Sequence, residues 1–143
     1  MIRKMTESDR AQYFEMSKSF YSSGAAHYKI EDEKRNKFWK FIVEGVFVNG
    51  YVLECENKVA GYALTVNYYS QEFGGKVFWI DELFVKPEFR GRNLGTEFLE
   101  YVKSLDGNVL LRLEAEKNNQ KAIALYKRLG FEELDYLQLI KKI

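Results

Sequence analysis

The feature that most constrains the fold of this chain is a long apolar run that stops at its single proline. Residues 76–85 are almost continuously apolar, and Pro87 follows them closely. Proline ends such a run because it has no N–H group to donate to a sheet ladder. Continuous apolar character indicates a strand that is buried on both faces. The chain is therefore expected to fold around a sheet with this strand at its centre.

A helix with a basic, glycine-containing start is predicted directly after this strand. Apolar residues recur every three or four positions, as on one helix face, at Leu94, Phe98, Tyr101, Val102 and Leu105. The loop before them is Arg90-Gly91-Arg92-Asn93. The first N–H groups of a helix have no partner and lie at the positive end of its dipole, so this start favours a phosphate group. The alternative is a solvated turn ahead of an amphipathic helix.

The rest of the chain predicts further strands and helices in one domain, residues 1–143. The expected strands cover 2–4, 51–56, 59–66, 76–85, 109–115 and 134–143, with a tight turn at Asn57-Lys58. The expected helices cover 6–22, 31–46, 91–105 and 119–129. This order, β-α-α-β-β-β-α-β-α-β, predicts an α/β fold with a mixed, mostly antiparallel central sheet flanked by helices on both faces.

Charge and composition exclude several classes of function. The formal net charge is +1, so no global field favours nucleic acid or an anionic membrane as a partner. One Cys and one His cannot build a typical zinc site, and no metal is expected. A G-x-x-x-x-G-K-S/T motif for nucleoside triphosphates is absent. The single Cys55 and the lack of an apolar leader or membrane-length stretch predict a cytoplasmic location.

Two blocks of the sequence resemble one known superfamily. Arg90-Gly91-Arg92-Asn93-Leu94-Gly95 resembles the R/Q-x-x-G-x-G/A pyrophosphate loop of the GNAT superfamily of acyl-CoA-dependent N-acetyltransferases. Residues 119–131, NQKAIALYKRLGF, resemble its N-x-x-A-x-x-L-Y-x-x-x-G-F helix. Asn93 stands where the pattern has its middle glycine, and asparagine tolerates a left-handed backbone better than most residues. The predicted element order also matches the GNAT arrangement.

The resemblance implies acetyl-CoA as the cofactor and names the residues that would contact it. The loop would hold the diphosphate, the end of the central strand would pair with the pantetheine arm, and Asn119 would bond the carrier while it also caps its helix. The implied cofactor-binding residues are Leu83, Phe84, Val85, Arg90, Gly91, Arg92, Asn93, Leu94, Gly95, Thr96, Asn119, Ala122 and Tyr126.

Two carboxylates in the central strand are the candidate general bases. An amine with a pKa near 10 must lose a proton before it can attack. Asp81 and Glu82 lie in an otherwise apolar strand, where burial raises a carboxylate pKa. Neighbours on a strand point to opposite faces, so one of the two is expected to meet the substrate, and which one stays open. The alternative is that one pairs with a core tyrosine or with Arg112.

The other catalytic roles follow from the resemblance. A backbone N–H between Leu83 and Val85 would bind the oxyanion, and Tyr126 would act as the general acid. The alternative for Tyr126 is a helical aromatic residue packed in the core.

The sequence thus predicts an N-acetyltransferase that moves an acetyl group from acetyl-CoA to a primary amine by direct attack in a ternary complex. A small-molecule acceptor is favoured over a peptide. The alternative is a non-catalytic acyl-CoA-binding sensor or interaction module of the same fold. An edge strand at residues 137–143 could pair between two subunits, so a homodimer is left open.

Overall fold

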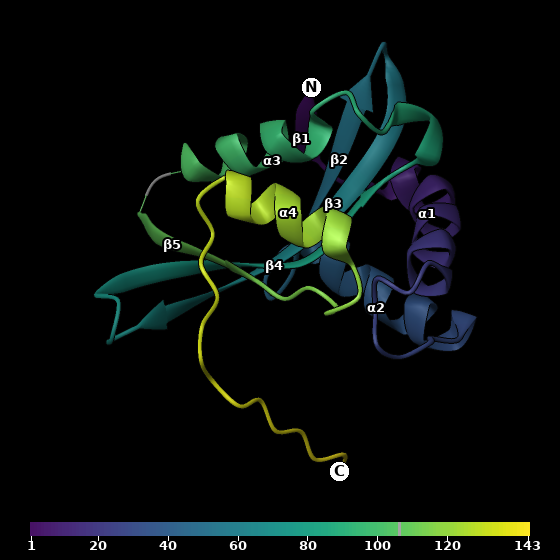
Figure 1. Cartoon of the computed structure of the whole chain (residues 1–143). Coiled ribbons are helices and arrows are strands. Elements are labelled where there is room, and N and C mark those ends of the chain that lie inside the picture. The colour runs from purple at the N-terminus through teal and green to yellow at the C-terminus, as the bar shows by residue number, and fades with distance from the viewer. Residues whose placement is uncertain (106) are drawn as a thin grey trace.

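The protein is built on one mixed sheet. Its computed structural model describes residues 1–105 and 107–143. The strands are β1 (Ile2–Lys4), β2 (Asn49–Cys55), β3 (Lys58–Ser70), β4 (Gly75–Val85) and β5 (Asn108–Leu113), and they lie side by side in sequence order (Figure 1). β1 to β4 pair antiparallel, and β5 pairs parallel to β4. The predicted mixed, mostly antiparallel sheet is confirmed.

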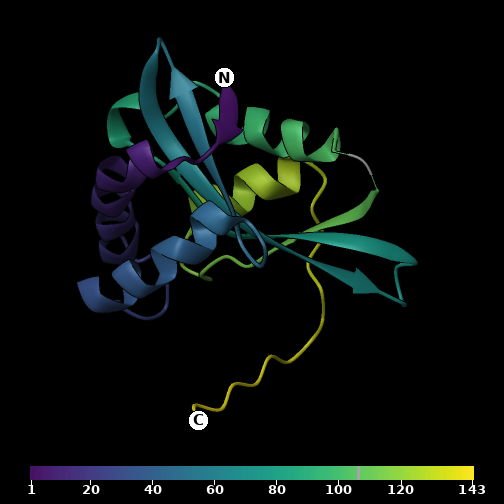
Figure 2. The same cartoon turned by 180° about the vertical axis from the view of Figure 1, so that it is seen from behind.

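Helices cover both faces of this sheet, as predicted. They are α1 (Arg10–Ser22), α2 (Asp32–Glu44), α3 (Leu94–Lys103) and α4 (Gln120–Arg128), with short 3-10 turns at Glu7–Asp9 and Pro87–Phe89. Figures 1 and 2 show α3 and α4 on one face and α1 and α2 on the other. Tyr13, Trp39 and Tyr62 pack in the core under α1 and α2. Tyr51 and Phe98 pack in the core under α3. No helix of the described residues could span a membrane.

The turn between β2 and β3 lies one residue earlier than predicted. Glu56 and Asn57 form it, with φ angles of 52° and 59°. Two successive residues with positive φ match the twist of a two-residue hairpin.

Gly61, just beyond the turn, allows the close approach of β3 to β4, because a Cβ at this position would lie 2.3 Å from the Phe84 carbonyl oxygen.

A β-bulge in β4 decides which side chains face which helices. Leu64 pairs with Glu82 but Thr65 pairs with Ile80, so Asp81 is an extra residue on β4. An extra residue reverses the alternation of side chains beyond it. Ile80 accordingly packs in the core under α3, whereas Phe84 packs in the core under α1 and α2.

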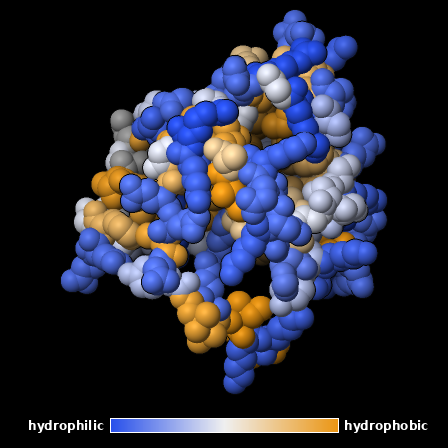
Figure 3. Space-filling view, viewed as in Figure 1, coloured by the Kyte–Doolittle hydropathy of each residue, from blue (hydrophilic) through white to orange (hydrophobic). Residues whose placement is uncertain are grey.

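The predicted final strand at residues 134–143 is wrong. Beyond α4 the chain has no regular structure, and it runs away from the sheet (Figure 1). Leu137, Leu139, Ile140 and Ile143 are each at least 72% exposed, and hydrophobic side chains gather at this edge in Figure 3. Strand propensity describes how a segment packs once a neighbour is present. Within one copy, this segment pairs with no described strand.

Candidate active site

The loop before α3 has the backbone conformation that its motif requires. Asn93, directly before the helix, has a φ of 62° and lies in the left-handed region. Gly91 has a φ of 79°, and a Cβ there would meet nothing within 4 Å. Asparagine thus serves at the position where the superfamily pattern has glycine, because its short polar side chain tolerates this region.

The loop presents a row of free backbone donors. None of the six N–H groups from Gly91 to Thr96 donates a hydrogen bond to any described residue. The Asn93 carbonyl accepts the first helical bond, from the Glu97 N–H at 2.9 Å. Consecutive free N–H groups at the positive end of a helix form an anion-binding site. These donors fit a diphosphate, and nothing in the described protein competes for them.

The two loop arginines have partners within the protein. Arg90 Nε donates to the Val85 carbonyl at 3.0 Å. Arg92 Nη1 lies 2.6 Å from Glu56 Oε1, in a pair whose side chains are 43% and 68% exposed. Exposed pairs of this kind contribute little free energy, so Arg92 is free to exchange Glu56 for a phosphate.

The two motif blocks meet in space beside β4. A Cβ at Gly95 would lie 3.9 Å from both Leu83 on β4 and Leu125 on α4. The pairing of β4 with β5 ends at Ile80 and Leu113. In the described chain, therefore, residues 82–85 of β4 pair with β3 alone. The far edge of this strand is available to a ligand between the loop and α4.

The β4 carboxylates differ sharply in environment. Glu82 is only 6% exposed, and it accepts hydrogen bonds from the Tyr21 hydroxyl at 2.6 Å and the Tyr62 hydroxyl at 2.5 Å. Burial raises the pKa of Glu82, against the lowering effect of the two tyrosines. The side chain of Asp81 is exposed. Neighbouring protein atoms still desolvate its carboxylate in part, and this desolvation, followed by the charge of Glu114, raises its pKa.

The alternative of a core tyrosine partner therefore applies to Glu82. Arg112 contacts neither carboxylate, and its Nη1 lies 3.3 Å from the Tyr68 hydroxyl. The sequence indicated a core tyrosine as an alternative partner, but it did not identify Tyr21 or Tyr62 as that partner. A regular alternation of β4 would not place Glu82 against them, and no local pattern predicted the bulge.

Tyr126 lies on α4 with its ring against Phe131, at a centroid separation of 5.7 Å. Burial raises the pKa of its hydroxyl, so it stays protonated at neutral pH. No described residue hydrogen-bonds to this hydroxyl. Asn119 Oδ1 accepts from the Ala122 N–H at 3.4 Å, and so it caps α4 as predicted. The Ala122 N–H is thus already occupied.

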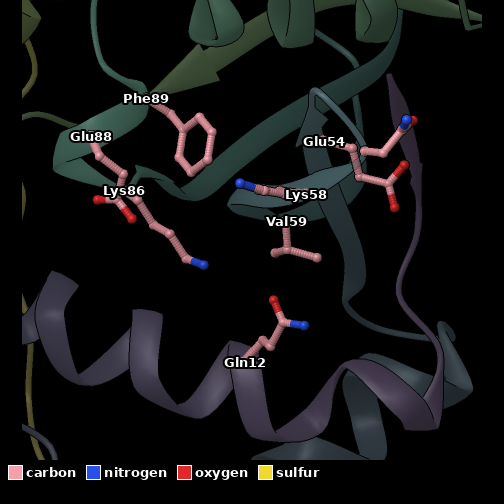
Figure 4. Close-up of a pocket in the computed structure, with 8 residues that line it drawn as sticks. Gln12, Glu54, Lys58, Val59, Lys86, Glu88 and Phe89 are labelled. Carbon is pink, nitrogen blue, oxygen red and sulfur yellow. The ribbon is translucent and has the colours of Figure 1, made fainter.

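A separate groove lies on the α1 side. Its volume is about 530 Å³, and it opens between α1, the β2–β3 hairpin and the segment after β4 (Figure 4). Lysines and glutamates of opposite charge line it, including Lys58, Lys86, Glu54 and Glu88. None of the predicted catalytic or cofactor-binding residues lines this groove.

A mixed sheet that parts at a bulged strand, next to a loop of free N–H groups, is the fold of acyl-CoA N-acyltransferases. The sequence profile of the Acetyltransferase (GNAT) family matches residues 7–131. The chain belongs to this family, whose members use acetyl-CoA.

Relatives are similar to this chain in sequence, and a solved structure is similar to it in fold. An uncharacterized N-acetyltransferase of Methanocaldococcus jannaschii is 30% identical over 99% of this chain, which spans 66% of that protein's length. The spermine/spermidine N(1)-acetyltransferase of Bacillus subtilis is 29% identical over 75% of this chain and 70% of its own. The aminoglycoside N-acetyltransferase AAC(6')-Iy, solved in complex with CoA, superposes with a TM-score of 0.80 at 18% identity, over 99% of this chain and 93% of its own.

Proposed function

We propose that this protein transfers an acetyl group from acetyl-CoA to a primary amine by direct attack in a ternary complex. The observation that carries the proposal is the row of six N–H groups from Gly91 to Thr96 that donate to no described residue, beside the edge of β4 that no described strand pairs with. A buried carboxylate, Glu82, lies on the same strand.

The cofactor would be held mainly by the main chain. The N–H groups of residues 91–96 would bind its diphosphate, and the free edge of β4 at Leu83 to Val85 would pair with its pantetheine arm. Acetyl-CoA supplies an acyl group activated as a thioester. The side chains of Arg90 and Arg92 would add charge at the rim of the loop.

The chain's own groups would move the protons. Glu82 has a raised pKa and suits the role of the base that accepts the ammonium proton. A β4 backbone N–H at Leu83 to Val85 would stabilise the oxyanion. Tyr126, kept protonated by burial, would donate a proton to the leaving sulfur. Asp81 would remain at the surface of the site and attract a cation.

The acceptor is proposed to be a small cationic amine. Desolvation raises the pKa of Asp81, and Glu114 lies close enough to raise it further, at the point where β4 and β5 part. Two like charges near an opening attract a polycation. The acceptors named for the Bacillus subtilis relative, spermine and spermidine, have this chemistry.

The test is a panel of primary amines with acetyl-CoA, scored by release of free thiol. Polyamines, aminoglycosides, amino acids and lysine peptides are the arms, and we expect the polyamines to accelerate release most.

The competing function is a sensor that binds CoA without turnover. Tyr126→Phe should lower kcat by about 10²-fold or more in an enzyme, because a general acid is lost, and should change nothing in a sensor. CoA binding without acceleration by any amine would favour the sensor.

We also propose that two copies associate through the C-terminal segment, residues 134–143. Four of its apolar side chains are at least 72% exposed, and β5 has a described neighbour on one side only. Exposed apolar patches and unpaired strand edges both promote association. The occupant we propose for the β5 edge is this segment of a second copy. The single cysteine favours a cytoplasmic setting for such a dimer.

A further inference from the structure

We propose that Tyr21 relays the proton between the acceptor amine and Glu82, so that the buried carboxylate acts as a base through a tyrosine hydroxyl. This inference rests on the proposed function and adds a residue that the sequence motifs do not include. Its basis is the arrangement of hydroxyl groups around Glu82.

Both carboxylate oxygens of Glu82 are occupied. Oε1 accepts from the Tyr21 hydroxyl at 2.6 Å, and Oε2 accepts from the Tyr62 hydroxyl at 2.5 Å. Glu82 is 6% exposed, so a substrate nitrogen has little direct access to either oxygen. The two hydroxyls are the hydrogen-bond partners of this carboxylate among the described residues, and so they offer a route by which a proton can reach it.

The two tyrosines differ in their access to solvent. Tyr62 has no exposed surface and lies within the aromatic core with Tyr13 and Phe20. Tyr21 is only partly buried and stands at the end of α1. Tyr21 is therefore the hydroxyl that a ligand can approach.

The loop that follows Tyr21 contacts the segment after β5. His27, in the loop between α1 and α2, lies with Nδ1 3.4 Å from Glu116 Oε1. Glu116 follows β5, and β4 parts from β5 at Ile80 and Leu113. Tyr21 bonds Glu82 at the end of α1 from which this loop starts, and the proposed acceptor amine would lie beside its hydroxyl.

The step balances without a further reactant. The ammonium nitrogen of the acceptor gives its proton to Tyr21 Oη while the Tyr21 hydroxyl proton passes to Glu82 Oε1. The N–H bond breaks, an O–H bond forms on Glu82, and Tyr21 ends as it began. The amine changes from +1 to neutral and Glu82 from −1 to neutral. The nitrogen keeps the electron pair that attacks the thioester carbonyl.

The titratable groups around Glu82 come from four elements. Burial raises the pKa of Glu82, and the hydroxyls of Tyr21 and Tyr62 lower it. Asp81 raises this pKa further, and Arg35 lowers it. Arg35 is only 2% exposed and bonds Ser17 at 3.0 Å, so its charge stays in place. The groups that face the carboxylate are Tyr13 and Tyr21 on α1, Arg35 on α2, Tyr62 on β3 and Asp81 on β4.

The experiment compares Tyr21→Phe with Tyr62→Phe across pH. Each variant removes one of the two hydroxyl groups that hydrogen-bond to Glu82 and keeps the aromatic ring, so the two variants are matched. We expect Tyr21→Phe to lower kcat/KM for the amine at pH 7 by about 10²-fold. This deficit should shrink toward pH 10, where the amine loses its proton without a relay. Tyr62→Phe should show a smaller loss, with no such recovery at alkaline pH.

A purely structural role for Tyr21 would give a different result. A loss that stays constant from pH 7 to pH 10, or equal profiles for both variants, would overturn the relay while the acetyltransferase function stands. A wild-type protein that acetylates no amine would instead overturn the proposed function and the relay with it.

A second measurement covers the case in which Tyr21→Phe does not fold. In mixtures of H₂O and D₂O, the wild-type rate on the amine should depend on the deuterium fraction with the curvature of two protons in flight. A linear dependence indicates one proton in flight and contradicts the relay.

Discussion

At the scale of single residues, Asn93 shows how a departure from a motif is accommodated. Its φ of 62° is the conformation for which the superfamily pattern has glycine. The sequence shows which residue takes this position but does not fix its backbone angle, because asparagine is tolerated in the left-handed region without being specific to it. The backbone angle and the free N–H groups on either side settle the loop's conformation.

Substitutions at Asn93 should separate backbone conformation from side-chain chemistry. Asn93→Gly should remain close to the wild type in stability and in CoA affinity, since glycine adopts positive φ without strain. Asn93→Val should lose about 1–2 kcal/mol of unfolding free energy and bind CoA more weakly, because a β-branched residue resists this region. Urea unfolding and CoA titration measure the two effects. Equal behaviour of both variants would show that the left-handed conformation is not required.

At the scale of elements, the start of α1 is held by an ion pair between the buried carboxylate of Asp9 and the partly exposed guanidinium of Arg3. Asp9 is 5% exposed and its carboxylate bonds the Arg3 guanidinium at 2.8 Å and the Thr6 N–H at 2.8 Å. These bonds connect β1 to the turn before α1. The Arg3 guanidinium, with help from Thr6, lowers the pKa of Asp9 to about 2.

The pair between Asp9 and Arg3 is expected to contribute a part of the unfolding free energy that depends on pH. A carboxyl whose pKa falls from 3.8 to about 2 on folding stabilises the protein above pH 4, and this share is lost as pH falls toward 2. Asp9→Asn should therefore cost about 2 kcal/mol at pH 7 and little at pH 2. Urea unfolding at a series of pH values measures the difference. Glu33→Gln, which breaks the exposed pair with Lys37, is the control and should change stability little at any pH. A difference for Asp9→Asn that is independent of pH would refute this account.

The close packing of β3 on β4 gives a second prediction at this scale. Gly61→Ala should lower unfolding free energy by about 1–3 kcal/mol, because its Cβ would lie 2.3 Å from the Phe84 carbonyl oxygen. The displaced strand is the one that would bind pantetheine, so CoA affinity should fall too. Gly95→Ala is the matched control for stability, since its Cβ meets atoms only at 3.9 Å. Thermal unfolding of the two variants measures the difference in stability. Equal melting temperatures would show that β4 moves to accommodate the added Cβ at little cost in free energy.

At the scale of the whole molecule, the C-terminal segment, residues 134–143, is the part whose apolar side chains a single copy leaves exposed. It touches the rest of the protein through few contacts, including Tyr136 with Glu72 at 3.2 Å and Lys142 over the Tyr28 ring at 4.9 Å. Its apolar side chains otherwise face outward (Figure 3). A segment of this kind contributes little to the stability of a single copy.

Removal of residues 134–143 should therefore change association more than folding. The full chain should sediment as a dimer and the shortened chain as a monomer, with nearly equal unfolding curves at low protein concentration. Sedimentation velocity measures this directly. Leu137→Lys with Leu139→Lys is a second variant that keeps the chain length, and it should also give a monomer. A full chain that stays monomeric at high concentration would contradict the proposed dimer.

The sequence alone determined the order of strands and helices up to residue 131 and the family. It also identified the residues that form the loop before α3. These features depend on local periodicity and on the backbone preferences of single residues such as Asn93 and Pro87, which a sequence displays directly. Only the tertiary structure gave Asp81 and Glu82 their different environments, one exposed and one buried, because one bulged residue on β4 reverses the faces beyond it. It also brought Tyr21 and Tyr62 to Glu82 from α1 and β3, and left the C-terminal segment without a partner among the described strands. Each of these outcomes depends on pairing across distant parts of the chain, and the geometry of that pairing is absent from any local pattern.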